Sequence, residues 1–156
     1  MSNFDWQEKK ADIEWFNDSN LNMALTVIDK HLNTPIAKKK ALIIEDDTGK
    51  VSEFTYEDLI KQTNKVANFL SSNVINKGDR VFLFLPRIPE LYINFLGILK
   101  TGAVAGTMFS AFGADALKDR LGNSKAKAVF TTKELAERIL PVKDELPDLE
   151  HIFIVD

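Results

Sequence analysis

The sequence predicts an α/β fold in which a mainly parallel sheet carries helices on both faces. From residue 55 onward, short apolar runs alternate with segments of helical spacing, and only a few residues separate one from the next. The run Val81–Leu85 is apolar throughout, which is typical of a strand covered on both faces. This alternation favours right-handed crossovers and therefore parallel strands.

The first forty residues differ from the rest of the chain. Residues 1–20 are polar with isolated aromatic side chains, and we expect an arm with one weak helical turn. Asn20 is a suitable cap for a helix predicted over residues 21–32, which Pro35 would end. We therefore interpret residues 1–40 as an N-terminal arm and first helix.

The α/β part is predicted to start at residue 41 and to run to residue 156. Its first two apolar runs, 41–45 and 51–54, enclose a short polar connector that contains Gly49. A glycine in a short polar connector predicts a β-hairpin.

Helices and strands then follow in turn. We expect helices over 55–71, 89–100, 114–121 and 133–140, and strands over 81–85, 103–107, 126–131 and 151–155. Thr55 and Asp58 have capping-box spacing. Pro89 suits the first position of its helix and Gly102 the position just after the end. For the last helix, Thr131 or Thr132 marks the start and Pro141 the end.

Composition excludes several classes of protein. The 156 residues are 45% hydrophobic and 28% charged, as in soluble globular domains. The balance of 20 basic and 23 acidic residues argues against nucleic-acid and membrane partners. There is no cysteine, so disulfides and thiolate chemistry are excluded. We see no signal peptide, and no apolar run approaches the roughly 18 residues that span a bilayer, so we expect a cytoplasmic location.

Few residues suggest chemistry. No metal-ligand spacing surrounds either histidine, His31 or His151, and we interpret both as surface or core residues. The glycine spacings match no phosphate-binding loop, and we predict no catalytic residue and no metal site. Arg87 follows a predicted strand and is a candidate contact for an anion, although a surface arginine beside Glu90 is the alternative.

The most informative stretch is 107–113, which leaves a predicted strand at its carboxyl end and enters a helix. Ligands of open α/β sheets bind at this edge. Ser110 and Ala111 are small enough to let the backbone approach a ligand. The alternative is that Phe109 and Phe112 simply fill the core.

Several motifs in order carry a resemblance to a known family. They are Phe54–Leu59, Lys77–Val81, Pro86–Glu90, Gly102–Gly106, Phe109–Gly113, Asp119–Leu121 and Ala128–Thr132. Together they resemble the start of the acyl-CoA synthetases of the adenylate-forming superfamily, and most of all the bacterial acetyl-CoA synthetases. The resemblance implies that the fold is the N-terminal portion of the large AMP-binding domain.

The resemblance also implies an activity for the intact enzyme. Such ligases condense a carboxylate with ATP to an acyl-adenylate, release pyrophosphate, and transfer the acyl group to coenzyme A. It implies small-molecule substrates with ATP, CoA and Mg, and a CoA contact at Phe109, Ser110 and Ala111. The family's phosphate loop and catalytic lysine would lie downstream, so the 156-residue chain alone is expected to be inactive and to bind none of these molecules.

Two other functions stay open at this point. The chain could be a self-contained, non-catalytic α/β binding or interaction module. A small flavodoxin-like or Rossmann-like nucleotide binder is a further alternative. The apolar run at 152–155, with no covering helix after it, suggests that sequence is missing. It also suggests self-association through an exposed sheet edge.

Overall fold

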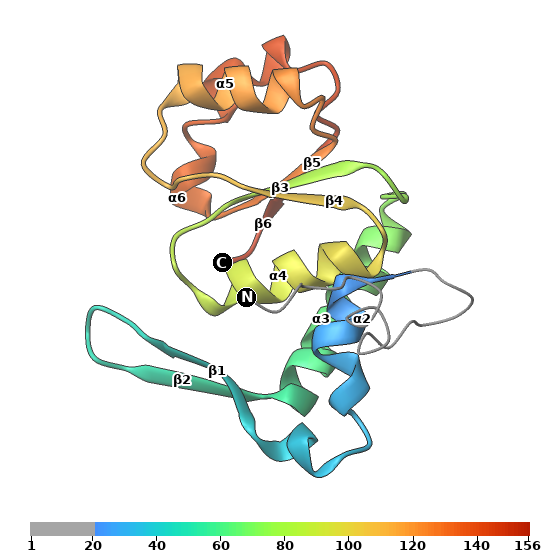
Figure 1. Cartoon of the computed structure of the whole chain (residues 1–156). Helices are drawn as coiled ribbons and strands as arrows, with labels where there is room; N and C mark the ends of the chain where they lie inside the picture. Colours follow the sequence, from blue (N-terminus) through green and yellow to red (C-terminus); the bar gives the residue numbers. More distant parts are fainter. Residues whose placement is uncertain (1–20) are drawn as a thin grey trace, which may run out of the picture.

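The computed structural model describes residues 21–156. The predicted arm and the predicted cap at Asn20 therefore lie outside the described residues. The chain forms a two-stranded sheet and a separate four-stranded sheet (Figure 1).

The helix predicted over residues 21–32 is wrong in its extent. Helix α2 (Met23–Val27) begins at Asn22, whose Oδ1 accepts hydrogen bonds from the Ala24 and Leu25 amides. Two 3-10 helices follow, η1 (Asp29–His31) and η2 (Pro35–Lys38), so Pro35 opens a helix rather than ending one. The chain turns after Val27 because a tertiary contact takes priority over helical continuation.

That contact is an ion pair between Asp29 and Lys100. The Lys100 Nζ lies 2.6 Å from Asp29 Oδ1 and 2.7 Å from Asn64 Oδ1, and the lysine side chain is only 4% exposed. A lysine this buried needs such partners, because an unpaired charge away from water is costly. The pair fastens the N-terminal segment to the helices that follow.

The predicted hairpin is present as β1 (Lys40–Glu45) and β2 (Val51–Thr55), which pair antiparallel. Asp46 closes its turn, with Oδ1 accepting from the Thr48 and Lys50 amides, and Gly49 adopts a positive φ of 82°. The hairpin projects away from the four-stranded sheet (Figure 1).

The four-stranded sheet is entirely parallel, with strand order β4-β3-β5-β6. Its strands are β3 (Arg80–Phe84), β4 (Val104–Thr107), β5 (Ala128–Thr131) and β6 (His151–Ile154). β4, β5 and β6 lie within the ranges that the sequence predicted, β3 begins and ends one residue earlier than its predicted range of 81–85, and the α/β fold class is confirmed.

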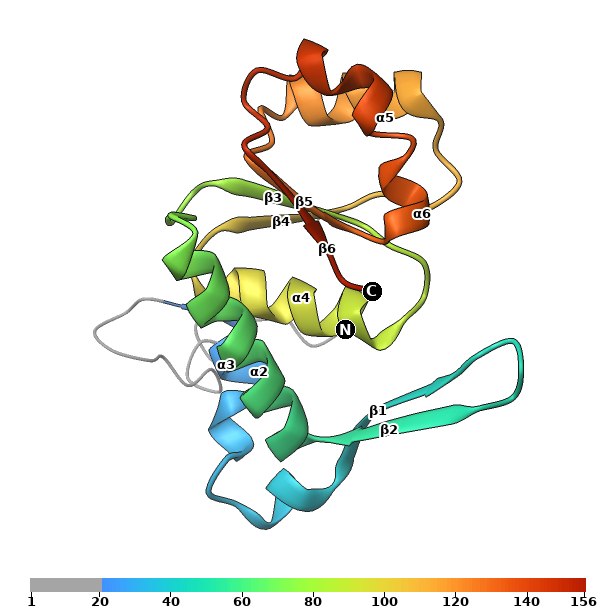
Figure 2. The same ribbon diagram turned by 180° about the vertical axis from the view of Figure 1, so that it is seen from behind.

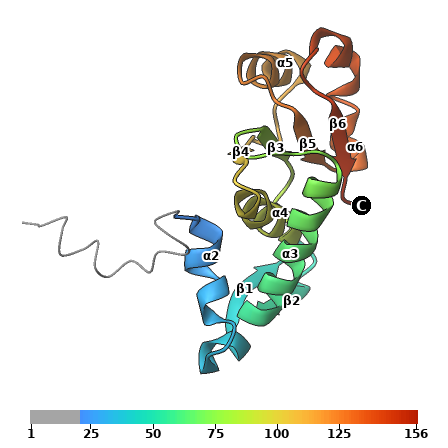
Figure 3. The same cartoon turned by 90° about the vertical axis from the view of Figure 1, so that its right-hand side faces the viewer.

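Helices cover both faces of this sheet (Figures 1, 2 and 3). On one face lie α3 (Tyr56–Ser72) and α4 (Pro89–Lys100), and on the other lie α5 (Ala114–Asn123), α6 (Lys133–Ala136) and the 3-10 helix η3 (Leu140–Glu145). The predicted start signals hold, because Thr55 and Asp58 form a capping box and Pro89 opens α4. Gly102 follows α4 with a φ of 78°, as expected for a residue just beyond a helix end.

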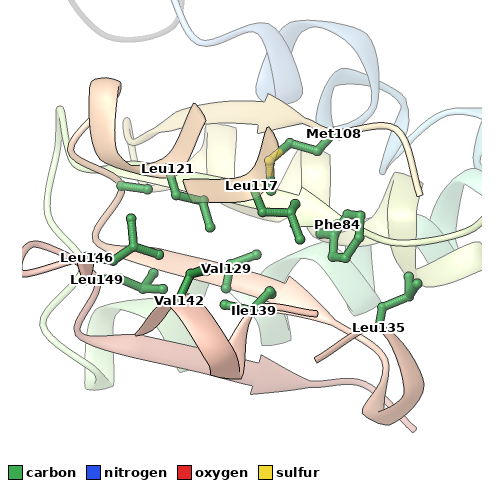
Figure 4. Packing of buried hydrophobic residues seen from close by; sticks show 11 residues of the cluster. Phe84, Met108, Leu117, Leu121, Val129, Leu135, Ile139, Val142, Leu146 and Leu149 are labelled. Atoms are coloured by element: carbon green, nitrogen blue, oxygen red, sulfur yellow. The ribbon is translucent and has the colours of Figure 1, made fainter. Parts of the chain in front are cut away.

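The alternation of side chains along β3 divides the core in two. Val81 and Leu83 face α3 and α4, whereas Phe84 faces α5 and α6. Figure 4 shows the second of these clusters, which consists of Phe84, Met108, Leu117, Leu121, Ala126, Val129, Leu135, Ile139, Val142, Leu146 and Leu149. β3 is therefore buried on both faces, which explains its uninterrupted apolar sequence.

The helix predicted over 133–140 is too long. Thr132 caps α6 through its Oγ1, which accepts from the Leu135 amide, but the α-helix ends at Ala136. The chain then turns so that Ile139 and Val142 are both buried in the cluster of Figure 4. Pro141 accordingly lies in the first turn of η3 instead of stopping a helix.

A network of polar contacts joins the segments at the amino ends of the parallel strands, which we call the amino edge of the sheet. The Gly78 amide donates to the Gly102 carbonyl over 3.0 Å, with Gly78 at a φ of 87°. Arg80 reaches the loop after α5, donating from Nε to Ser124 O (2.9 Å) and from Nη2 to Lys125 O (2.6 Å). These contacts join the segments that precede three neighbouring strands.

Asp79 is the charged centre of this network. Its Oδ2 accepts from the Asn76 amide at 2.8 Å and from Lys127 Nζ at 3.0 Å. Partial burial alone would raise the pKa of this carboxyl, but the Asn76 hydrogen bond and the neighbouring Lys127 outweigh it and hold the pKa below its usual value of 3.8. The ionised form is thus favoured in the folded protein.

Within residues 21–156, none of the helices combines the length and apolar character needed to traverse a lipid bilayer.

The crossing of α3 and α4 leaves no room for a side chain at Gly97. A Cβ at this position would lie 2.5 Å from Val66 Cγ1 and 2.6 Å from Val66 Cβ. Overpacking costs about 1–3 kcal/mol, more than the roughly 1 kcal/mol that alanine gains over glycine in a helix. Gly97→Ala should lower the free energy of unfolding in urea by up to about 2 kcal/mol. The matched control is Gly122→Ala in α5, where the new Cβ would be 3.6 Å from Leu146 and stability should hold or rise. Equal effects at the two glycines would contradict this account of the crossing.

The second prediction concerns Asp79. Because its pKa is lower in the folded than in the unfolded chain, its contribution is present above pH 4 and is lost as the pH falls through the folded-state pKa. Asp79→Asn should therefore destabilise the protein at pH 7 by about 1–2 kcal/mol. The difference should shrink at acidic pH, as measured by urea unfolding at several pH values. Asp144→Asn, at an exposed position in η3, serves as the control. A deficit that does not change with pH would show that the charge is not responsible.

Candidate functional site

The candidate site is a hollow of about 350 Å³ at the carboxyl edge of the four-stranded sheet. Each strand contributes a residue shortly after its end: Pro86 after β3, Ser110 after β4, Thr132 after β5 and Asp156 after β6. Parallel strands place all their carboxyl ends at one edge, and ligands of open α/β sheets bind there. The remaining lining residues, Glu134, Leu135 and Arg138, come from α6 and the turn that follows it.

Two charged side chains of the hollow are fixed by the backbone around them. Arg138 donates from Nη1 to the Ser110 carbonyl at 2.9 Å and, more weakly, to the Phe112 carbonyl at 3.4 Å. Asp156 accepts the Lys133 amide at 2.7 Å, which places a carboxylate at the start of α6. The hollow thus combines one arginine with the carboxylates of Asp156 and Glu134.

The loop between β4 and α5 contributes Ser110 to the lining of the hollow. It starts at Met108, which is buried and whose amide donates to Leu83 O at 2.9 Å. The Phe109 side chain is 67% exposed, and its ring meets that of Phe112 edge to face at 5.9 Å. Phe112 packs against the core cluster, with the Arg120 guanidinium 4.1 Å above its ring. The interpretation that both rings fill the core is therefore wrong for Phe109 and correct for Phe112.

Of the four predicted site residues, Ser110 lines the hollow, whereas Phe109, Ala111 and Arg87 do not. Ser110 is half-buried and lines the hollow, and Ala111 is exposed beside it. Arg87 is exposed on the loop after β3 and is not part of the lining. Within residues 21–156 it makes no ion pair, with Glu90 or with any other residue.

The two histidines make aromatic contacts away from the hollow. His31 meets Tyr56 edge to face at 4.7 Å, and His151 stacks on Phe153 at 5.3 Å. In the part of the chain that the structure describes, no cluster of histidine, aspartate or glutamate has the arrangement needed to hold a metal ion.

Sequence reasoning missed the charged side of the hollow. Glu134 and Arg138 are four residues apart in the segment that follows β5, so the predicted helix would have placed them on one face at the carboxyl edge. That spacing was an available signal. The bond from Arg138 to Ser110 was not available, because it joins residues 28 apart in the sequence.

The sequence is similar to proteins of a known family. A family described as "AMP-binding enzyme" matches residues 31–156. The acetyl-coenzyme A synthetase of Bacillus subtilis is 44% identical over 153 residues, which are 97% of this chain and 26% of that protein. The acetyl-coenzyme A synthetase of Deinococcus radiodurans is 35% identical over 160 residues, 97% of this chain and 24% of the relative. The chain spans about a quarter of the length of these curated relatives.

A solved structure extends the similarity to three dimensions. The crystal structure of an acyl-CoA synthetase from Brucella canis superimposes with a TM-score of 0.86 at 28% identity, covering 99% of this chain and 27% of that one. Fold and sequence therefore agree. Because the family match covers most of the sequence and includes every strand of the four-stranded sheet, this chain belongs to the AMP-binding enzyme family.

Proposed function

We propose that this chain forms the coenzyme A-facing part of an AMP-forming acid–CoA ligase that acts on acetate. The observation that carries the proposal is the loop with the exposed Phe109 at the carboxyl edge of the sheet, in a chain 44% identical to an acetyl-coenzyme A synthetase. Acetate is the proposed acid because both curated relatives described above are named for it.

The proposed reaction has two steps. Acetate and ATP form acetyl-adenylate and pyrophosphate, and the thiol of coenzyme A then displaces AMP to give acetyl-CoA. The residues proposed to meet coenzyme A are Phe109, Ser110 and Ala111. The exposed Phe109 ring offers a flat apolar face on which an adenine base can stack, and the two small residues leave room beside it.

The residues described here do not fit ATP or Mg²⁺. The sequence has no glycine-rich phosphate loop, and residues 21–156 hold no acidic or histidine cluster suited to a metal ion. We therefore assign no adenylation step to these residues and propose that the 156-residue chain alone is inactive.

Four expectations from the sequence remain predictions. They are an anion contact at Arg87, a boundary between residues 1–40 and 41–156, a cytoplasmic location, and self-association through a sheet edge. The last rests on the outer strands of the four-stranded sheet, β4 and β6, since a strand with one unpaired side invites pairing with another chain.

The proposed activity is tested by comparing the 156-residue chain with the product of the full reading frame from which it comes. We expect the product of the full reading frame to catalyse acetate-dependent ATP–pyrophosphate exchange and to form acetyl-CoA. The 156-residue chain should do neither. Reactions without acetate are the control. Exchange by the short chain would contradict its proposed inactivity, and a full product without exchange would contradict the ligase assignment.

The coenzyme A contact is tested by Phe109→Ala in the same full product. Base stacking on an aromatic side chain contributes about 1–3 kcal/mol, which predicts a rise of roughly 5- to 160-fold in KM for coenzyme A. KM for ATP and for acetate should stay the same. Val104→Ala is the matched control, because Val104 is an exposed apolar residue at the opposite end of β4. Equal changes in the two variants would argue against a role for the Phe109 ring.

A further inference from the structure

We infer that Arg138 is a positioning residue, which holds the Phe109–Gly113 loop in the shape that coenzyme A requires. The inference rests on the proposed function. Its basis is the pair of hydrogen bonds from the Arg138 guanidinium to the Ser110 and Phe112 carbonyls.

The guanidinium extends from a firmly anchored turn. Leu135 and Ile139, on either side of Arg138 in the chain, are 6% and 0% exposed in the core cluster. The Arg138 amide donates to Leu135 O at 3.1 Å, and the Ile139 amide donates to Ala136 O at 2.9 Å. Because both flanks are packed against the sheet, the backbone of Arg138 has little freedom to move with the loop.

The loop itself is anchored mainly at its two ends. Met108 joins its start to β3, and the Gly113 carbonyl accepts from the Leu117 amide at the start of α5. Between these ends the described backbone contacts include one turn, from the Phe112 amide to Phe109 O at 3.0 Å. Among residues 21–156, Arg138 is the one side chain that donates hydrogen bonds to carbonyls of this loop. The shape of the loop tip therefore depends on it.

Within the described residues, no ion pair competes with the hydrogen bonds that Arg138 donates to these carbonyls. Glu134 and Asp156 line the same hollow, yet no ion pair to either is present within the described residues. An arginine stays charged throughout the working range of pH, and charge-assisted hydrogen bonds are stronger than neutral ones.

The two carbonyls lie on either side of Ala111, at the tip. The weaker, 3.4 Å bond to Phe112 also links Arg138 to the residue whose ring contacts Phe109. Removing the guanidinium should therefore release both the small residues and the stacking ring that we propose for coenzyme A.

The experiment uses three variants of the full reading-frame product. Arg138→Met keeps the apolar stem and loses every donor, and Arg138→Lys keeps the charge but offers only a compact ammonium. Lys40→Met is the matched control, in which the same kind of change is made at a lysine whose side chain is 58% exposed on the β1–β2 hairpin. The measurements are KM and kcat for each substrate, and hydrogen exchange of the Phe112 amide.

Arg138→Met should raise KM for coenzyme A by about tenfold or more, as expected when a binding group is misplaced by a fraction of an ångström, while kcat at saturating coenzyme A stays within about twofold. Exchange at Phe112 should become roughly tenfold faster. Arg138→Lys should recover part of both effects, and Lys40→Met should show neither.

An unchanged exchange rate at Phe112 in Arg138→Met would overturn the positioning role. Faster exchange with an unchanged KM for coenzyme A would overturn its link to that substrate. Equal losses for every substrate would point to a general structural role and would also overturn the inference. If the unmodified product proves inactive, the proposed function fails, and the exchange rate alone decides whether Arg138 holds the loop.

Discussion

The burial of parallel strands on both faces is the constraint on which this structure depends. The alternating side chains of β3 reach two separate hydrophobic clusters, so helices must lie above and below the sheet. Parallel strands also require every connection to cross back over a face. All four strands therefore end at the same edge, and the segments that follow them converge there. The hollow lined by Pro86, Ser110, Thr132 and Asp156 is a direct result of this geometry.

The two edges of the sheet have different roles. At the amino edge, Gly78, Asp79 and Arg80 join the segments before neighbouring strands through hydrogen bonds and an ion pair. These residues belong to one of the motifs that carry the family resemblance, and they lie at the opposite end of the strands from the hollow. These contacts give Gly78, Asp79 and Arg80 a structural role. The carboxyl edge instead leaves Phe109 exposed and carries a hollow lined in part by charged side chains.

Local signals predicted most of the fold, and non-local contacts explain where prediction failed. The capping box at Thr55 and the start of α4 at Pro89 depend on residues close in sequence, and both are present. The predicted extent of the first helix was wrong because Asp29 pairs with Lys100, which is 71 residues away. Topology located the loop at Ser110, but Arg138 could not be joined to it from the sequence. That contact joins residues 28 apart and depends on how α6 packs against the sheet, which no local pattern states.

The most direct test of this account is a crystal structure of the full reading-frame product with coenzyme A bound. The account predicts that the nucleotide part of coenzyme A lies at the carboxyl edge of the sheet, in contact with the Phe109 ring and the backbone of Ser110 and Ala111. Coenzyme A bound at the amino edge, or nowhere near the β4–α5 loop, would contradict it.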